Sequence, residues 1–382
     1  MASYQDRMKR YRELIAGKAD LVFVPIGTDL DYLTGLHRDI PNYGRNLHPG
    51  MWLEGAWIVP DRDPILTLPR MTAEFGSAGG FEGADVRVLG DWDDPATMVS
   101  GILKDFGIGS GATIATSDDA EAESLIELQR LVPGATFASA TAILRELRVI
   151  KDADEIETLR AAGVITETAF AEVVKQLKIG MSELDVVAEV DYQMKKQGSL
   201  GPSFTTSLYN TGPNIQMLFG KRLASWPRVL TPPVSVLFDF GAVHDGMCYD
   251  FGRTVSFGAP SEEQVRVHRL IMESQRAGIE ALKADQITCA AVDKVARDVL
   301  VDAGYGDKFR HRLGHAIGWD VHEPPFLTAG DETLVREGMV FTIEPSIFQD
   351  GDFSARVEDC IVARPGGGEP LTTGFQDLVV IE

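Results

Sequence analysis

The sequence reads VSVLFDFGAVHDGMCYDFGRT from Val234 to Thr254 and sets two acids, Asp239 and Asp250, in otherwise apolar runs. Asp245 and Gly246 lie close to the midpoint between these acids, and an Asp-Gly pair is typical of tight β-hairpin turns. We therefore expect two antiparallel strands in which Asp239 and Asp250 face each other, with Cβ atoms roughly 4.5–5.5 Å apart.

A second stretch repeats this arrangement. Glu344 lies in the run VFTIEP, Glu358 lies in the run ARVEDCIV, and Asp350-Gly351 falls midway between them. The spacing predicts a second hairpin that brings two further carboxylates together.

Four carboxylates inside apolar strands are very unfavourable without cations, because desolvation and mutual repulsion both oppose their ionisation. One interpretation gives each acid an arginine or lysine partner, or leaves the hairpins at exposed sheet edges. The matched pairs favour divalent metal instead, since four carboxylates total −4 and two M²⁺ ions total +4. Oxygen ligands with an imidazole suit Mn²⁺, Fe²⁺, Co²⁺ or Zn²⁺, and two such ions form a hydrolytic clamp.

The imidazole is expected from the histidine-rich stretch 309–322. His311 and His315 have i, i+4 spacing, but Leu313-Gly314 argues against a helix there, and the glutamate of a helical zinc motif is absent. Flanking glycines permit close approach of the backbone to a ligand and single out His315. A structural role is expected for the four histidines outside this stretch, His37, His48, His244 and His268.

The 382 residues predict two domains, and 36 Lys and Arg against 57 Asp and Glu give a formal net charge of −21. This charge argues against binding to nucleic acid or to an anionic membrane, which both require clustered basic residues. We interpret the short basic cluster 308–312 as a solvated loop.

Three cysteines are too few for a disulfide framework, which favours a reducing cytoplasm. No run approaches 18 apolar residues and the N-terminus lacks the apolar core of an export signal, so we expect neither a membrane span nor a signal peptide.

Residues 1 to about 145 read as a mixed α/β unit. Helices are expected at 95–106 and at 118–131, the second capped by Ser117. Strands are expected at 21–26, 56–59, 65–68, 86–89 and 114–116.

From about residue 150 the order helix, helix, strand, strand occurs twice. The four helices are expected to begin after the caps Asp152, Ser182, Ser261 and Thr288. The strand pairs are expected at 234–240 with 247–256 and at 339–346 with 357–363. We take this order as a hypothesis of internal structural duplication.

These motifs resemble those of the M24 metallopeptidases, the family of methionine aminopeptidase, aminopeptidase P, prolidase and the metal-free creatinase. The resemblance is carried by the runs LFDFGA, YDFGRT, LGHAIG, TIEP and RVED, and the segment 147–155 is similar to the prolidase, aminopeptidase P and creatinase branch. It implies an α+β fold: a creatinase-like mixed α/β domain at 1–147, then a pseudo-twofold pita-bread domain at 148–382, an antiparallel curved sheet covered by helices.

The resemblance also implies a set of metal ligands. Asp239 would chelate one ion, Asp250 and Glu358 would bridge two, and His315 and Glu344 would bind the other. It implies two divalent ions per chain, Mn²⁺ or Co²⁺ first and Zn²⁺ or Fe²⁺ as alternatives, with a metal-bridging hydroxide as nucleophile.

Three residues carry catalytic roles by the same resemblance. Glu344 would also pass a proton to the leaving nitrogen. His322 matches the family histidine beside the scissile carbonyl and would stabilise the oxyanion. Arg356 matches the arginine two residues before the bridging glutamate and would hold that glutamate or a substrate carboxylate.

The sequence departs from the family pattern at two positions. The segment 212–220 lacks the histidine found upstream of the first ligand strand in prolidases and aminopeptidases P, and Phe219 takes its place. The tyrosine often found after Glu-Pro is Phe348 here. We therefore expect a more apolar substrate pocket with fewer hydrogen-bond donors.

The resemblance implies a homodimer that hydrolyses the Xaa-Pro bond of dipeptides or short peptides. The missing histidine leaves an alternative, an M24-type hydrolase of a non-peptide amide or other C–N bond in a small metabolite. A non-catalytic M24 binding module is a third interpretation, which the complete ligand set disfavours.

Overall fold

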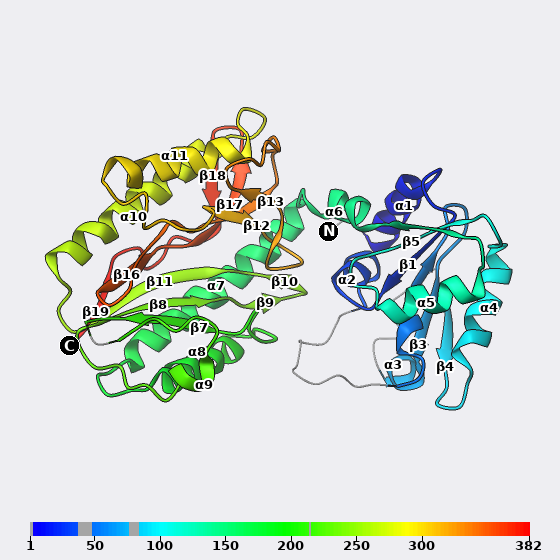
Figure 1. Ribbon diagram of the computed structural model, residues 1–382, viewed down its shortest axis with the longest axis horizontal. Coiled ribbons are helices and arrows are strands. Elements are labelled where there is room, and N and C mark those ends of the chain that lie inside the picture. The colour runs from blue at the N-terminus through cyan, green and yellow to red at the C-terminus, as the bar shows by residue number, and fades with distance from the viewer. Residues whose placement is uncertain (1–2, 37–47, 76–83, 214) are drawn as a thin grey trace. The chain divides into compact units, whose positions relative to one another are not determined.

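The computed structural model describes residues 3–36, 48–75, 84–213 and 215–382. The chain divides into two compact units, Met1–Arg148 and Val149–Glu382 (Figure 1). That the units are independent domains with a boundary at 147/148 stays a prediction.

The first unit has a six-stranded sheet in the order β4-β3-β2-β1-β5-β6. Its strands are β1 (Leu21–Pro25), β2 (Gly55–Ile58), β3 (Ile65–Pro69), β4 (Asp85–Leu89), β5 (Thr113–Thr116) and β6 (Thr136–Ser139). Strand β2 is antiparallel to both its neighbours, and the other pairs are parallel. The five predicted strands are confirmed; β6 was missed because its sequence, TFAS, is short and mostly exposed.

The helices of this unit are α1 (Tyr4–Ile15), α2 (Thr28–Thr34), α3 (Arg70–Phe75), α4 (Pro95–Phe106), α5 (Ala122–Leu131) and α6 (Thr141–Arg148), with a short 3₁₀ turn at Met51–Leu53. The prediction for α4 is confirmed. The predicted start of α5 at 118 is wrong, because Ser117 accepts a backbone bond from Ala120 in a turn and the helix begins after Glu121.

In the second unit the predicted helix starts are confirmed. Its helices are α7 (Ala153–Gln176), α8 (Glu183–Lys196), α9 (Arg222–Ser225), α10 (Glu262–Ala281) and α11 (Cys289–Asp302). The side chains of Asp152, Ser182, Ser261 and Thr288 each accept a hydrogen bond from the backbone N–H three residues later. Each bond satisfies a donor that the first turn of a helix leaves unpaired.

Two sheets form the centre of the second unit, in the orders β19-β11-β8-β7 and β13-β12-β14-β17-β18. In chain order the strands of the unit are β7 (Ser207–Thr211), β8 (Val234–Phe240), β9 (Val243–His244), β10 (Met247–Cys248), β11 (Phe251–Phe257), β12 (Gly314–Ala316), β13 (Glu323–Leu327), β14 (Val340–Ile343), β15 (Ser346–Gln349), β16 (Phe353–Arg356), β17 (Asp359–Arg364), β18 (Gly367–Pro370) and β19 (Val379–Ile381). A backbone bridge between Gly252 and Glu358 connects the two sheets. The expected antiparallel sheet is thus present as two sheets joined at this bridge, and the β11–β19 pair is parallel.

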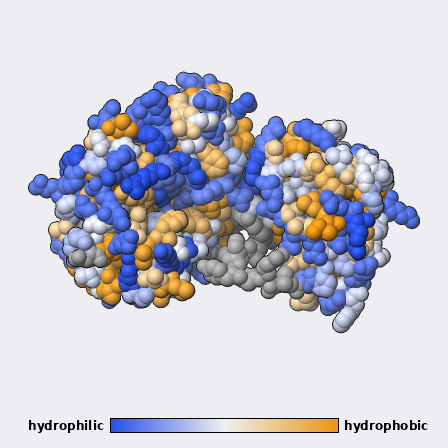
Figure 2. Space-filling model, viewed as in Figure 1, coloured by the Kyte–Doolittle hydropathy of each residue, from blue (hydrophilic) through white to orange (hydrophobic). Residues whose placement is uncertain are grey.

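Figure 1 shows these strands lying between the α7–α8 pair and the α10–α11 pair. The order helix, helix, hairpin thus occurs in both halves, in line with the hypothesis of structural duplication. On the face seen in Figure 2, hydrophilic side chains cover most of this unit, with smaller hydrophobic groups between them. Among the described residues, no helix is both long and apolar enough to cross a membrane.

The register of the first hairpin differs from the prediction. Asp239 pairs with Gly252 rather than with Asp250. The turn is centred on Asp245 and Gly246, whose φ values of 44° and 78° fit a type I′ turn. The centre of this turn lies one residue further along the chain than the midpoint of the two acids. Each residue of one strand therefore pairs with a partner two residues away from the one expected. The acids are diagonal neighbours on one face, which still lets their side chains meet.

The second hairpin has the predicted register. Ile343 pairs with Asp359 on one side of the acids, and Ser346 pairs with Arg356 on the other. Glu344 and Glu358 therefore lie opposite each other between two ladders. The predicted strand 339–346 is interrupted at this point, because Pro345 has no N–H to donate to a ladder.

Candidate active site

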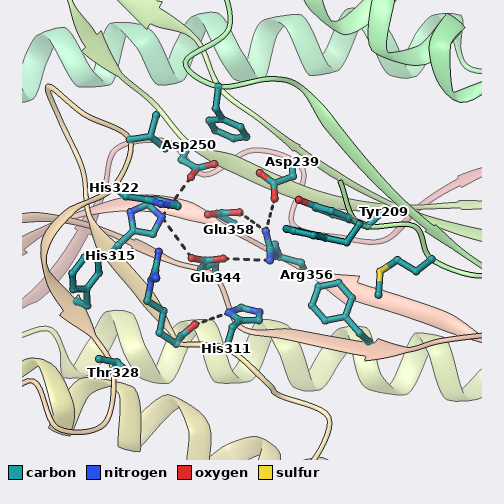
Figure 3. Close-up of a pocket in the computed structure, with 17 residues that line it drawn as sticks. Tyr209, Asp239, Asp250, His311, His315, His322, Thr328, Glu344, Arg356 and Glu358 are labelled. Atoms are coloured by element: carbon teal, nitrogen blue, oxygen red, sulfur yellow. Dashed lines mark hydrogen bonds and ion pairs between the residues drawn. The ribbon is translucent and has the colours of Figure 1, made fainter. Parts of the chain in front are cut away.

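The second unit contains a cavity of about 900 Å³. All nine residues predicted from the sequence as ligands, catalytic groups or pocket residues line it, together with eight others (Figure 3). The nine are Phe219, Asp239, Asp250, His315, His322, Glu344, Phe348, Arg356 and Glu358. Their roles stay predictions, but the fold brings them to one place.

The four carboxylates reach the cavity from breaks or ends of strands. Asp239 is the penultimate residue of β8, and Asp250 lies between β10 and β11. Glu344 directly follows β14 and Glu358 directly precedes β17. A glycine opposite Asp239 makes room for the second hairpin, since a Cβ at Gly252 would lie only 2.6 Å from Oε2 of Glu358.

His315 enters the same cluster from β12. A side chain on Gly314 would clash with the Thr342 carbonyl oxygen, so this glycine lets β12 approach β14 closely. Nδ1 of His315 lies 3.1 Å from the Ala316 carbonyl oxygen, and because a carbonyl only accepts, Nδ1 carries the proton. Nε2 then presents a lone pair, 3.6 Å from both Asp250 Oδ2 and Glu344 Oε1. These separations exceed a hydrogen bond and suit a ligand atom.

Three overlapping groups in this cluster have the chemistry of metal sites, with ligand atoms within 4.8 Å of one another in each group. They are Asp239 with Asp250 and Glu358, His315 with Glu344 and Glu358, and Asp250 with His315 and His322. The first two groups together contain the five predicted ligands and share Glu358.

Arg356 is the cation of the cluster. Its guanidinium donates to Asp239 at 2.9 Å and to Glu358 at 3.3 Å, and lies 3.3 Å from Glu344. Its Nε donates to Ser346 Oγ at 2.7 Å, which fixes the side chain from behind. The interpretation that the acids have an arginine partner is thus partly right. One positive charge against four carboxylates leaves these five side chains with a formal charge of −3.

Burial sets the protonation of the acids. It raises the pKa of Asp239, and it raises the pKa of Asp250 and Glu358 well above the usual range, with repulsion from neighbouring carboxylates adding to the effect. Burial raises the pKa of Glu344 to about 7, although the Arg356 charge opposes this. Asp250 Oδ1 is buried without a hydrogen-bond partner among the described residues. A buried, unpartnered carboxylate oxygen in an acid cluster fits a metal ligand.

His322 lies against this cluster, between β12 and β13. Its ring centroid is 4.0 Å from that of His315. Partial burial lowers the pKa of His322, and the charge of Arg312 lowers it further. The imidazole is therefore neutral at neutral pH and has one N–H to donate into the cavity.

An aromatic wall borders the other side of the cavity. The rings of Tyr209 and Phe219 stack with centroids 5.7 Å apart, and Phe348 lies edge-on to Tyr209 at 6.5 Å. Burial raises the pKa of Tyr209 to about 12, so its hydroxyl stays protonated at neutral pH. Phe219 is 77% exposed, which leaves its ring available to a ligand in the cavity.

Sequence reasoning missed eight residues of the cavity: Phe204, Tyr209, Met217, His311, Arg312, Val321, Phe326 and Thr328. The sequence contained a signal for His311, which lies four residues before His315 in the histidine-rich stretch. The interpretation of 308–312 as a solvated loop is wrong for Arg312, whose side chain lines the cavity. Of the histidines given a structural role, His268 is buried and bonded to the Gln376 carbonyl, while His37 lies outside the described residues.

The sequence model of metallopeptidase family M24 matches residues 157–365. The Xaa-Pro dipeptidase of Lactobacillus helveticus is 31% identical over 364 residues, covering 95% of each chain.

Among solved structures, a dipeptidase of Pyrococcus horikoshii has a TM-score of 0.85 at 28% identity and covers 98% of this chain and 100% of its own. A recombinant prolidase of Thermococcus sibiricus has a TM-score of 0.87 at 26% identity, with both chains covered completely. These structures share the expected α+β, pita-bread architecture.

Proposed function

The chain belongs to metallopeptidase family M24, and from this premise we propose that it is a metal-dependent hydrolase of the Xaa-Pro bond in dipeptides or short peptides. The observation that carries the proposal is the convergence of five ligand-type side chains and His322 in one cavity. The names of the similar proteins, an Xaa-Pro dipeptidase and a prolidase, support the substrate class.

We assign the metal ligands to Asp239, Asp250, His315, Glu344 and Glu358, of which Asp250 and Glu358 would serve two ions. The donor set fits, because it combines carboxylate oxygens with a single imidazole nitrogen. When bound, two divalent ions supply Lewis acidity, which polarises a carbonyl and lowers the pKa of a water molecule. Mn²⁺ or Co²⁺ is proposed first, with Zn²⁺ or Fe²⁺ as alternatives.

Side chains of the protein are proposed to supply the remaining catalytic functions. Glu344 is proposed to accept a proton from the nucleophile and to deliver it to the leaving proline nitrogen. His322 presents a neutral N–H to the oxygen on which negative charge develops. Arg356 holds three of the carboxylates in place through its hydrogen bonds and ion pairs.

The test uses purified protein loaded separately with Mn²⁺ or Co²⁺ and a panel of Xaa-Pro dipeptides and longer Xaa-Pro peptides. We expect cleavage of at least one dipeptide and its loss in the variant Asp250→Ala. Absence of cleavage across the whole panel with either metal would exclude the prolidase-type activity.

A second candidate is hydrolysis of a non-peptide amide or another C–N bond. It is favoured by Phe219, which stands where the family has a histidine and stacks on Tyr209. Turnover of a small amide from a metabolite library, without turnover of any Xaa-Pro peptide, would establish this candidate.

Metal analysis tests the binding-module interpretation, which predicts fewer than about one divalent ion per chain after reloading.

We further propose a homodimer. Gel filtration of the metal-loaded protein is expected to give twice the mass of the chain, and elution at the mass of one chain would contradict it. The cytoplasmic location stays a prediction.

A further inference from the structure

The loop 317–322 connects β12 to β13 and carries His322 to the cavity. His322 is exposed, and its ring packs against His315 with centroids 4.0 Å apart (Figure 3). Among the described residues, the His322 ring makes no hydrogen bond that would fix its direction. The backbone of the loop must therefore hold this side chain in place.

Two contacts fix the first half of this loop. The Gly318 carbonyl accepts from the Cys248 N–H at 2.7 Å, which joins the loop to β10. The indole N–H of Trp319 donates to the Glu155 carboxylate at 3.0 Å, which joins the loop to the first turn of α7. Both contacts lie three or four residues before His322, so the second half of the loop needs an anchor of its own.

That anchor is a buried ion pair between Lys151 and Glu323, the residue after His322. Lys151 Nζ lies 2.9 Å from Glu323 Oε2, and the two side chains are 0% and 6% exposed. The other carboxylate oxygen of Glu323 accepts from the Asp320 N–H at 3.0 Å. Glu323 thus closes the segment 320–323 on itself and fastens it to the lysine.

The backbone of Lys151 is itself held in place. Its N–H donates to the Gly338 carbonyl at 2.9 Å, and the next residue, Asp152, caps α7. A Cβ on Gly318 would lie only 2.5 Å from Cε of Lys151, so a glycine stands where the lysine side chain meets the loop. The lysine is therefore packed against the loop as well as paired with it.

Stability alone does not account for a fully buried lysine–glutamate pair. The cost of desolvating both charges is comparable to their mutual attraction, and replacing such a pair by apolar side chains of similar volume is often neutral for stability. What an ion pair can add is a defined arrangement of the two segments that it joins. Here these segments are the start of α7 and the loop that carries His322.

We propose that Lys151 and Glu323 are positioning residues for the hydrolytic reaction, whose ion pair holds the segment 320–323 and thereby directs the His322 ring towards the oxygen on which negative charge develops. The inference rests on the proposed function and goes beyond it, since neither residue lines the cavity. Displacing a group of the active site by about 1 Å lowers the rate by about 100-fold. The pair therefore acts on kcat through geometry, without touching the substrate.

The experiment replaces both partners at once, because removing one of them leaves a buried charge unpaired. In the metal-loaded enzyme, the double variant Lys151→Met/Glu323→Met should lower kcat for an Xaa-Pro dipeptide about 10- to 100-fold and change KM by less than about 3-fold. Its metal content should equal that of the wild type. An unchanged kcat in the folded double variant would overturn the inference.

A cycle with His322→Ala distinguishes positioning from a general structural effect. If the pair acts through His322, its replacement has no further effect once that ring is absent. The same double replacement should therefore change kcat by less than about 2-fold in the His322→Ala background. An equal loss of kcat in both backgrounds would show that the pair does not act through His322 and would overturn the inference.

Another ion pair of the same unit supplies the matched control. Arg160 Nη2 lies 2.6 Å from Glu369 Oε1, and neither residue lines the cavity. Arg160→Met/Glu369→Met should keep the kcat of the parent protein in both backgrounds. Circular dichroism melts check the fold of every variant. If Lys151→Met/Glu323→Met does not fold, Lys151→Arg takes its place, since it keeps the charge and changes the geometry of the pair.

Hydrogen exchange measured by mass spectrometry separates this inference from the proposed function, because it needs no substrate. In the metal-loaded Lys151→Met/Glu323→Met protein, the amides of 317–323 should exchange at least about 10-fold faster than in the wild type, and those of the control should not. Faster exchange confined to this loop, in a protein that cleaves no Xaa-Pro peptide, would support the anchor and overturn the proposed function. Cleavage with both kcat and loop exchange unchanged by the replacement would overturn the anchor alone.

Discussion

The two hairpins of the second unit each bring two carboxylates into the cavity, but by different geometry. In the first, a two-residue turn at Asp245-Gly246 sets the register and the acids lie diagonally on one face. In the second, the ladder is interrupted and Glu344 and Glu358 lie directly opposite each other. Similar acid clusters therefore arise from strands with different registers.

The difference shows what a metal site requires of its scaffold. In each hairpin the ladder is interrupted at an acid: Asp250 stands in the gap between β10 and β11, and Glu344 stands before Pro345, whereas Asp239 is paired within β8. These interruptions free the side chains from strict alternation across the sheet. What the two hairpins share is the meeting point, where Gly252 leaves space for Glu358.

Removing one acid from the first hairpin has the largest expected effect on this arrangement. Asp250→Ala removes the carboxylate whose Oδ1 is buried and unpartnered, and we expect Xaa-Pro hydrolysis to fall at least about 10³-fold, together with loss of bound metal. Steady-state kinetics and metal analysis measure the two effects. Asp352, an exposed acid of the second hairpin, supplies the control Asp352→Ala, which should keep both properties. Full activity in Asp250→Ala would exclude it as a ligand.

Filling the space between the hairpins tests their meeting point without removing an acid. A Cβ in Gly252→Ala would lie 2.6 Å from Glu358 Oε2 and 2.8 Å from Arg356 Cδ, so Glu358 must move. We expect metal affinity to fall about 10- to 100-fold, the range seen when groups that orient ligands are changed. Calorimetric titration measures it. Gly366→Ala is the matched control, because no atom lies within 4 Å of its Cβ position, and an unchanged affinity in Gly252→Ala would contradict the close packing.

Titration of Glu344 in the metal-free protein tests how strongly the second hairpin buries this acid. Its pKa is raised from 4.5 to about 7 by burial, so the folded state holds the proton more tightly than the unfolded state. The associated stability is fully present below pH 4.5 and is lost as the pH rises towards 7. Relative to Glu344→Gln, the chelator-treated wild type should therefore lose about 3 kcal/mol of unfolding free energy between pH 4.5 and 7.5.

Urea melts at several pH values measure this difference. Glu332 is exposed, and Glu332→Gln should give curves parallel to the wild type. A constant difference between wild type and Glu344→Gln across the pH range would mean that Glu344 titrates normally.

The turn of the first hairpin carries the smallest expected effect. Gly246 has φ 78°, a region that costs little for glycine and more for alanine. Gly246→Ala should lower the free energy of unfolding by about 1 kcal/mol and leave catalysis nearly unchanged, because Asp239 is also held by Arg356. Thermal denaturation and kinetics test both halves of this statement. A large loss of activity would show that the turn alone controls the register.

The acids could be identified from the sequence because carboxylates are conspicuous in apolar runs. The second hairpin was predicted in the same way, from the Asp-Gly pair midway between Glu344 and Glu358. The first register was missed by two residues, since a midpoint does not show which two residues make the turn. Tyr209 could not be assigned to the cavity, as β7 gives no local signal and the residue arrives there by pairing of β7 with β8. Arg312 was misassigned because its environment depends on Phe326, a residue from another strand.

The raised pKa values of Asp250, Glu344 and Glu358 have a consequence for how the protein acquires metal. Groups that hold protons in the metal-free state must release them when ions bind. Loading is then a proton-releasing reaction, so its apparent affinity increases with pH and its measured heat depends on the ionisation enthalpy of the buffer. A dilute, weakly buffered solution of the apoprotein should become more acidic as the ions are added.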